Sequence, residues 1–287
     1  MSRIITMPSA PNFNRSEFEL FRAIGQTVSP FTGKQRTQEF DAVYWMGTMT
    51  LPPMKREQAR NWQSFLMQLK GTTNTFAMGD PDALSPQGTY NGNNFTGSAQ
   101  VNTGSSAVSI AISGANVTRS GAFANAFAGS FIHITGAAND GNNGTHKVAS
   151  KTNNNTVVLD TTFSPDLTNE TFNGKIKQNV KGAEALNLVR TGSGSGTVKK
   201  GDYLGVLSAN SATAAPKQLV LAVEDAVVSG TQYSIQTEPK LRNDLTDGFF
   251  VTYSAPRGLF RLQDNTVTWS ANQVSTYGIS FAVQEVV

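Results

Sequence analysis

The chain of 287 residues carries 23 Lys and Arg against 20 Asp and Glu, a net charge of +3, and only 15% of its residues are charged. Because this charge is small and forms no dense Lys/Arg stripe, we expect no nucleic-acid sequence recognition. The absence of cysteine excludes disulfides, thiolate metal sites and a cysteine nucleophile.

The N-terminal part predicts an arm followed by two strands. Residues 1–17 are polar and irregular, which is typical of an extended arm, and residues 18–33 alternate as in a strand that ends at a Ser-Pro turn. Residues 37–53 predict a longer strand that stops at Pro52 and Pro53. Apolar side chains occupy both of its faces: Phe40, Ala42, Tyr44 and Met46 on one, and Val43, Trp45 and Met49 on the other. We therefore expect both faces to be covered.

One segment predicts a helix. Residues 55–69 place Trp62, Phe65, Leu66 and Leu69 on one stripe, and Gly71 follows as a C-terminal stop. Residues 74–83 then predict a short strand with a turn at Asp-Pro-Asp. We expect the helix to close one side of a sheet and to pack its stripe into the open face.

Composition changes between residues 92 and 176, where charge is scarce and small residues are abundant. Phe131–Thr135, His146–Ser150 and Thr156–Asp160 read as strands between Asn/Gly turns. The sequence predicts a small inserted β-domain here, within a discontinuous core domain built from residues 18–91 and 177–287.

The C-terminal part returns to longer strand patterns, such as "VKKGDYLGVLS", "KQLVLAVEDAVVSG" and "TQYSIQTEPKL". The last stretch predicts three strands, and the closing one, Tyr277–Val286, alternates Ile279, Phe281 and Val283 against small or polar residues. We expect this last strand to pair with an early strand and complete the core domain.

Several short motifs are candidates for chemical sites. Asp80 and Asp82 suit a turn better than a cation site, and "NDGNNG" (139–144) lacks the spaced carboxylates of a calcium loop. "GSGSGT" (192–197) lacks the ending of a phosphate loop and reads as a flexible connector, and Lys199 and Lys200 beside it read as a solvated turn.

The two histidines, His133 and His146, lie in strand patterns without acidic neighbours at ligand spacing. A Ser-His-Asp arrangement stays open, because its members need not be close in sequence. We predict no catalytic, cofactor or metal site and no enzymatic activity.

A resemblance covers roughly residues 18–90 and 180–287. The ordered motifs "SPFTGKQRTQEFDAVYWMGTMTLPPMKREQARNWQSFLMQLKGTTNTFAMGDPD", "GDYLGV", "EPKLR", "APRGLFRLQDNTVTWS" and "STYGISFAVQEV" resemble the distal tail (baseplate hub-ring) proteins of long-tailed bacteriophages. The family implies a split, tail-tube-like β-barrel in which the helix acts as a plug. It also implies a homohexameric ring at the virion tail tip, between the tail tube protein and the hub, made in the bacterial cytoplasm. Residues 92–176 depart from the family.

The alternative is a host-surface or carbohydrate-binding adhesion protein that acts through residues 92–176. That segment contains Phe but no Trp or Tyr, which disfavours strong sugar stacking. No apolar run approaches the ~20 residues that span a bilayer, and no signal-peptide pattern opens the sequence, so we expect no membrane insertion by this chain.

Overall fold

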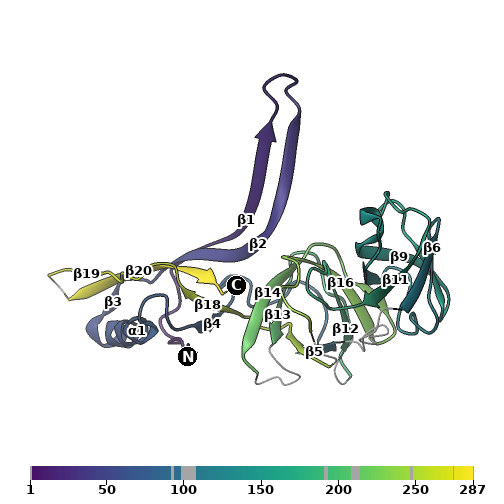
Figure 1. Cartoon of the computed structure of the whole chain (residues 1–287). Coiled ribbons are helices and arrows are strands. Elements are labelled where there is room, and N and C mark those ends of the chain that lie inside the picture. Colours follow the sequence, from purple (N-terminus) through teal and green to yellow (C-terminus); the bar gives the residue numbers. More distant parts are fainter. Residues whose placement is uncertain are drawn as a thin grey trace. The chain divides into compact units, whose positions relative to one another are not determined.

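The structure is a computed structural model that describes residues 2–91, 94–97, 108–190, 193–207, 214–245, 248–273 and 275–286 (Figure 1). In these residues it is mainly β, with one α-helix, α1 (Arg56–Leu69), and one 3-10 turn, η1 (Asp140–Asn142). The predicted mainly β class, with barrels and a single α-helix, is confirmed.

The chain divides into two compact units. The first, here called the hairpin unit, comprises Met1–Leu84, Ala215–Leu219 and Ala255–Val287. The second, here called the barrel unit, comprises Ser85–Ala214 and Val220–Ser254. The strands of the predicted discontinuous core are therefore shared between two units.

The hairpin unit contains an open antiparallel sheet in the order β1-β2-β20-β18-β4, with β3 and β19 also paired to β20. Its strands are β1 (Arg15–Val28), β2 (Gln35–Thr50), β3 (Met54–Lys55), β4 (Phe76–Met78), β18 (Gly258–Leu262), β19 (Trp269–Ala271) and β20 (Thr276–Glu285). The last strand, β20, pairs with the early strand β2, which confirms the predicted pairing.

Helix α1 covers the sheet of the hairpin unit. The predicted stripe is buried, and Trp62 and Phe65 contact Phe281 of β20 and Phe76 of β4 at ring-centroid distances of 6.0 and 5.3 Å. The helix ends at Lys70 in the left-handed conformation, one residue before the predicted glycine stop. Because this sheet is open, α1 does not plug a closed barrel as the family resemblance implied.

The barrel unit contains two closed rings of strands. The first ring runs β10-β7-β6-β11-β8-β9 and uses β6 (Val108–Ser113), β7 (Asn116–Thr118), β8 (Phe131–Thr135), β9 (Gly144–Asn153), β10 (Thr156–Leu159) and β11 (Glu170–Lys177). The three strands predicted in the middle segment correspond to β8, β9 and β10. A core of aliphatic side chains with Phe123 fills the interior.

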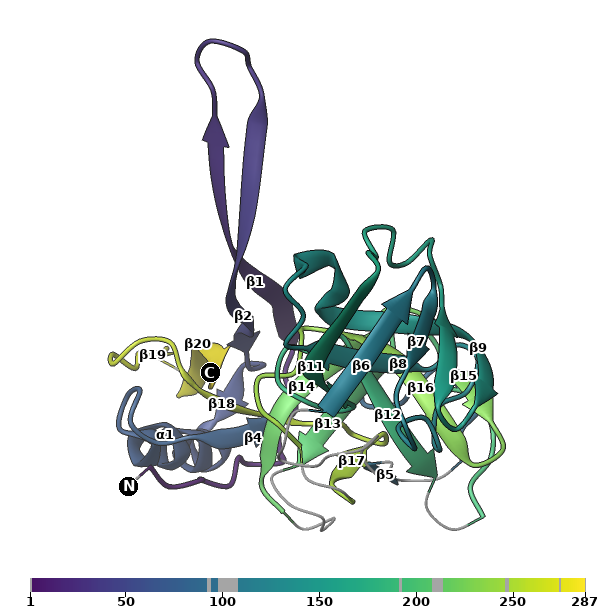
Figure 2. The same ribbon diagram turned by 45° about the vertical axis from the view of Figure 1, so that its right-hand side comes forward.

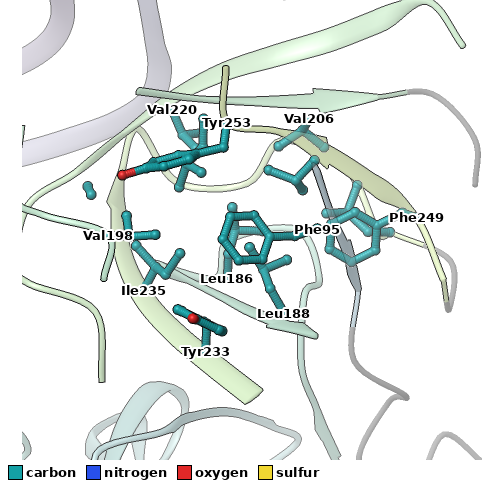
Figure 3. Packing of buried hydrophobic residues seen from close by; sticks show 14 of the residues in the cluster. Phe95, Leu186, Leu188, Val198, Val206, Val220, Tyr233, Ile235, Phe249 and Tyr253 are labelled. Atoms are coloured by element: carbon teal, nitrogen blue, oxygen red, sulfur yellow. The ribbon is translucent and has the colours of Figure 1, made fainter. Parts of the chain in front are cut away.

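The second ring runs β12-β5-β17-β13-β14-β16 and closes through the pairing of β12 with β16. β15 pairs with the first residues of β16, whereas β14 pairs with its last two. Its strands are β5 (Asn94–Gly97), β12 (Ala185–Arg190), β13 (Tyr203–Leu207), β14 (Pro216–Ala222), β15 (Val227–Ser229), β16 (Gln232–Glu238) and β17 (Phe250–Thr252). Of β14, only the part from Val220 belongs to the barrel unit, since Ala215–Leu219 belongs to the hairpin unit. Figure 3 shows Phe95, Leu186, Leu188 and Ile235 pointing toward one another in its core.

The position of β5 changes the boundary of the inserted segment. β5 lies within the predicted insert of residues 92–176, yet it pairs with β12 and β17, and Phe95 is fully buried in the second ring. Among the described residues the strands of the first ring begin at β6, so the structure removes β5 from the predicted insert.

Candidate assembly surface

The most prominent surface feature is the β1–β2 hairpin. The two strands pair from Arg15–Thr50 to Val28–Gln35, and the outer part projects from the sheet as a two-stranded ribbon (Figures 1 and 2). The loop closes with Ser29 N donating to Lys34 O at 2.9 Å, and Gly33 supplies the positive φ that this loop requires. We call residues 21–40 the hairpin arm.

The base of the hairpin is buried, whereas the large apolar side chains of the arm are partly or largely exposed. At the base, Phe18 stacks on Trp45 at 5.4 Å, and Trp45 and Met49 are buried. Along the arm the large apolar side chains are exposed: Phe21 39%, Ile24 56%, Val28 56%, Phe31 95% and Phe40 50%. The expectation that both faces of the second strand are covered is therefore wrong for the arm, where Phe40 is half exposed.

The exposure of large apolar side chains on the arm has a physical cost. A two-stranded ribbon is marginally stable in water unless its apolar side chains are covered. Adjacent exposed apolar residues also mark interaction sites more often than solvated surface. The arm therefore qualifies as a binding element.

A second feature is a groove beside α1, walled by the N-terminal residues. These residues are held at two points: Ile5 N donates to Thr75 O at 2.7 Å, and Phe13 contacts Trp62 at 5.5 Å. The predicted extended arm is thus laid against the hairpin unit. The groove has a volume of about 360 Å³, and its apolar lining includes Met7, Pro11, Phe13, Trp62, Met78 and Leu84. We call it the N-terminal groove.

An acidic hollow of about 360 Å³ adjoins this groove, since Phe13 and Pro81 line both. Asp80 and Asp82 line the hollow. Asp80 Oδ1 accepts a hydrogen bond from Asp82 N at 3.1 Å, which is the turn-forming role expected for this pair.

The histidines lie in the barrel unit. His146 is buried, with Nδ1 2.9 Å from Ser164 Oγ and Nε2 3.1 Å from Asn142 O, and burial lowers its pKa. His133 is half-buried, with Nδ1 3.2 Å from Thr145 Oγ1, and its pKa is lowered by burial and then by the neighbouring His146. A Ser-His pair therefore exists, but both side chains are enclosed and the third partner is a backbone carbonyl, which suits a structural role.

The "NDGNNG" loop is held by a carboxylate that no sequence motif marks. Glu170 accepts hydrogen bonds from Ala138 N at 2.7 Å, Asn142 Nδ2 at 2.8 Å and both nitrogens of Asn139. These donors lower the pKa of Glu170 to about 2, with Ala138 N contributing most. No local pattern could have found this residue, since it lies about 30 positions along the chain from the loop.

The glycine-rich segment is ordered where it is described, although Gly192 lies outside the described residues. Thr197 O accepts from Tyr90 N at 3.0 Å, and Asn91 N donates to Ser195 O at 3.0 Å. A Cβ at Gly196 would lie 2.3 Å from Thr89 O. The expectation of a flexible connector is therefore wrong for Ser195–Thr197, where glycine permits close backbone approach.

The turn after this segment carries ionic contacts. Lys199 Nζ lies 2.6 Å from Asp225 Oδ2 at an exposed position, and this contact is the main cause of the lowered pKa of Asp225. The nearby Asp202 is buried and accepts from Gln87 N, Lys199 N and Tyr253 OH, at 2.6, 2.8 and 2.6 Å. Burial, followed by the bond to Asp202, raises the pKa of Tyr253. This network fixes the loop at residues 85–90.

Arg119, next to the first ring, carries a charged side chain that is buried. The residue is 2% exposed, and none of its three guanidinium nitrogens has a hydrogen-bond partner among the described residues. Burial lowers its pKa. No sequence pattern signals this buried cation, because Arg119 follows β7 at a Ser-Gly turn that reads as exposed.

Across the part of the chain that the structure describes, no cluster of three or more potential metal ligands occurs. The described helices also include none with the length and hydropathy of a bilayer span. Comparison with known proteins gives no family model and no curated protein that matches this chain.

Proposed function

We propose that this chain is a structural subunit that self-associates into a ring at the distal end of a phage tail, where it links the tail tube to the tail-tip hub. The observation that carries the self-association is the hairpin arm, whose five large apolar side chains are 39–95% exposed. The resemblance of residues 18–90 and 180–287 to distal tail proteins supplies the location and the hexameric order.

An arm that docks on a different surface of the next subunit makes a heterologous contact, and heterologous contacts form a ring when the rotation closes. The resemblance to distal tail proteins favours this ring over a two-fold exchange of arms. A stable interface buries about 800 Å² on each partner, an area that a ribbon of this length can supply.

The adhesion alternative has less support. In the described residues of the first ring, Phe123 and Phe131 are buried, and the ring offers no Trp or Tyr on which a sugar could stack. No observation in this part of the chain favours a glycan site.

The test is to shorten the arm without disturbing its base. Arg22 and Val43 are cross-strand partners, so replacing residues 23–42 with Asn-Gly joins them by a two-residue turn. We expect the wild-type chain to form rings visible by electron microscopy at high concentration or on tails, and the shortened chain to stay monomeric with a similar melting temperature.

A second variant separates the length of the arm from its apolar character. Ile24→Thr, Val28→Thr and Phe31→Ser keep the ribbon but remove three of its exposed apolar side chains, and this chain should also stay monomeric. A shortened chain that still forms rings would refute the role of the arm. Virions whose tail tips lack this chain, as judged by antibody labelling, would refute the proposed location.

A further inference from the structure

The tip of the hairpin arm combines one apolar side chain with positive charge. Phe31 is 95% exposed, and Lys34 and Arg36 are the only charged residues between Thr27 and Gln38. All three side chains are exposed. The tip therefore presents an aromatic ring beside two cations and no anion.

The N-terminal groove and the acidic hollow show the opposite arrangement. The groove is lined mainly by apolar side chains such as Met7, Trp62 and Met78, and the adjoining hollow carries Asp80 and Asp82. Arg257 also lines the groove and is the one cation there, but it does not line the hollow. Apart from Ser9, Asn12 and Arg257, the groove is lined by apolar side chains and Gly79, and this lining next to a hollow with two carboxylates complements an aromatic ring beside two cations.

The tip cannot reach the groove of its own copy. Phe18 lines the acidic hollow, and the strand from Phe18 to Val28 spans roughly 33 Å at about 3.3 Å per residue. Figure 2 shows the ribbon pointing away from α1 and β4, which border the groove. A second copy of the chain is thus the source of any tip that enters it.

We propose that the tip of the hairpin arm of one copy docks on the next copy, with Phe31 in the N-terminal groove and Lys34 and Arg36 beside Asp80 and Asp82. This inference rests on the proposed ring and identifies the two surfaces that build it. The groove volume of about 360 Å³ lies within the range of ~300–1,000 Å³ found for ligand pockets. An aromatic side chain buries about 150–250 Å² on entering such a site.

The N-terminal groove is also preformed. Its wall is held by Phe13, which contacts both Trp62 and Phe281, at 5.5 and 6.1 Å. Pro8 and Pro11 in the wall restrict the backbone, so docking orders little additional chain. Association through a preformed groove loses less conformational entropy than association through a mobile segment.

The cysteine-free chain allows a direct test by disulfide formation. Thr32→Cys, next to Phe31, and Ser9→Cys, on the groove, are made in separate full-length chains, mixed, and oxidised with oxidised glutathione. Docking predicts a disulfide between the two chains. The matched control uses Met67→Cys, on the exposed face of α1, in place of Ser9→Cys. Met67 is 52% exposed, and its cysteine variant should form a disulfide with the Thr32→Cys chain at least ~10-fold more slowly than the Ser9→Cys variant does.

Charge-reversal variants then test the proposed contacts between Lys34 and Arg36 of the tip and Asp80 and Asp82 of the hollow. Asp82→Lys alone, or Lys34→Glu with Arg36→Glu alone, should slow the Thr32→Cys to Ser9→Cys reaction about tenfold, and the combination should restore it. Salt should weaken the wild-type preference, because exposed charges are screened within about 10 Å at 0.1 M.

The outcomes separate this proposal from the ring itself. A chain that forms rings but gives no Thr32→Cys to Ser9→Cys disulfide, or reacts as fast at Met67→Cys, overturns the docking and leaves the ring intact. A chain that neither associates nor forms the disulfide overturns both. Rapid reaction at the groove with rescue by the combined reversal supports the docking.

Discussion

The two units of this chain differ in how much strand edge and apolar surface they leave exposed. The barrel unit closes its strands into two rings, so that few strand edges are left and the aromatic side chains of the second ring, such as Phe95 and Tyr253, are buried. The hairpin unit keeps an open sheet and extends two of its strands into a ribbon with exposed Phe31 and Ile24.

Under the proposed ring, this difference assigns association to the hairpin unit. Closure of a sheet removes the unpaired edges that attract other chains, whereas an open ribbon keeps them available. The barrel unit buries most of its large apolar side chains, although Arg119 is an exception among its polar groups, while the hairpin unit leaves Phe31 and Ile24 exposed. We expect folding of the barrel unit and assembly through the hairpin unit to respond to different mutations.

The largest expected effect comes from the boundary of the inserted ring. Replacing residues 98–177 with a Gly-Ser linker should leave the second ring folded, because both junctions lie near β12. Gly97 is opposite Leu188, and Asn179 Nδ2 donates to Asn187 O at 2.9 Å. Loop closure adds only about 0.6 kcal/mol per doubling of length.

The matched control starts the same deletion at Gly92 and therefore also removes β5 and Phe95. This control should unfold the second ring, as measured by circular dichroism and calorimetric melting. Equal stability of the two deletions would show that β5 is dispensable. Loss of structure in both would show that the first ring supports the second, and the insert would not be a separate folding unit.

The next effect concerns the packing of α1. Trp62 is 1% exposed, so Trp62→Ala should destabilise the hairpin unit by roughly 3–5 kcal/mol and weaken ring formation. Met67→Ala on the same helix should change stability by less than about 0.5 kcal/mol, because Met67 is half exposed. Denaturant unfolding of both variants measures the difference, and a stable Trp62→Ala chain would show that the helix does not anchor the sheet.

These positions also show what the sequence could and could not predict. Helix α1 and its buried stripe followed from the spacing of Trp62, Phe65, Leu66 and Leu69, because a helical period is a local property. The pairing of β20 with β2 followed from its alternation and its place at the end of the fold. Neighbouring residues carry the information for the helix and for the strand character of β20, but not for the choice of β2 as its partner.

The missed features depend on distant partners. Apolar residues on both faces of β2 suggested two covering layers, and sequence alternation cannot distinguish a covered face from one kept for another subunit. β5 has only four residues, and its membership of the second ring depends on β12 and β17, more than 80 positions away. The bonds from Glu170 to the "NDGNNG" loop are likewise visible only in three dimensions.

Replacement of Arg119 should change stability less than the variants above, and it should stabilise the chain rather than destabilise it. A buried donor without a partner is destabilising by roughly 1–3 kcal/mol, so Arg119→Met should raise the melting temperature of the barrel unit. Arg60→Met, at an exposed position of α1, is the matched control and should have little effect. A lower melting temperature for Arg119→Met would show that the guanidinium group is satisfied in solution, for instance by a bound anion.

The smallest effect is a pH dependence of the barrel unit. Burial lowers the pKa values of His133 and His146 in the folded chain, whereas histidine in the unfolded chain titrates near 6.5. As the pH falls below about 6.5 the unfolded chain takes up protons first, so the free energy of unfolding decreases until the pH has passed the folded pKa values. Each unit by which burial lowers a pKa corresponds to about 1.4 kcal/mol.

The window between pH 6.5 and 5 isolates these two residues, which are the only histidines of the chain, because Asp and Glu side chains titrate mainly at lower pH. Around His133, Glu184 and Asp244 oppose the lowering and Lys240 adds to it, so His146, where burial acts with fewer charged neighbours, should carry more of the effect. Urea unfolding of the barrel unit at pH 7, 6 and 5 should show declining stability in the wild type. The decline should be smaller in His146→Gln and absent in His146→Gln with His133→Gln. An unchanged decline in the double variant would assign the pH dependence to other groups and would show that folding does not lower the pKa values of the two histidines.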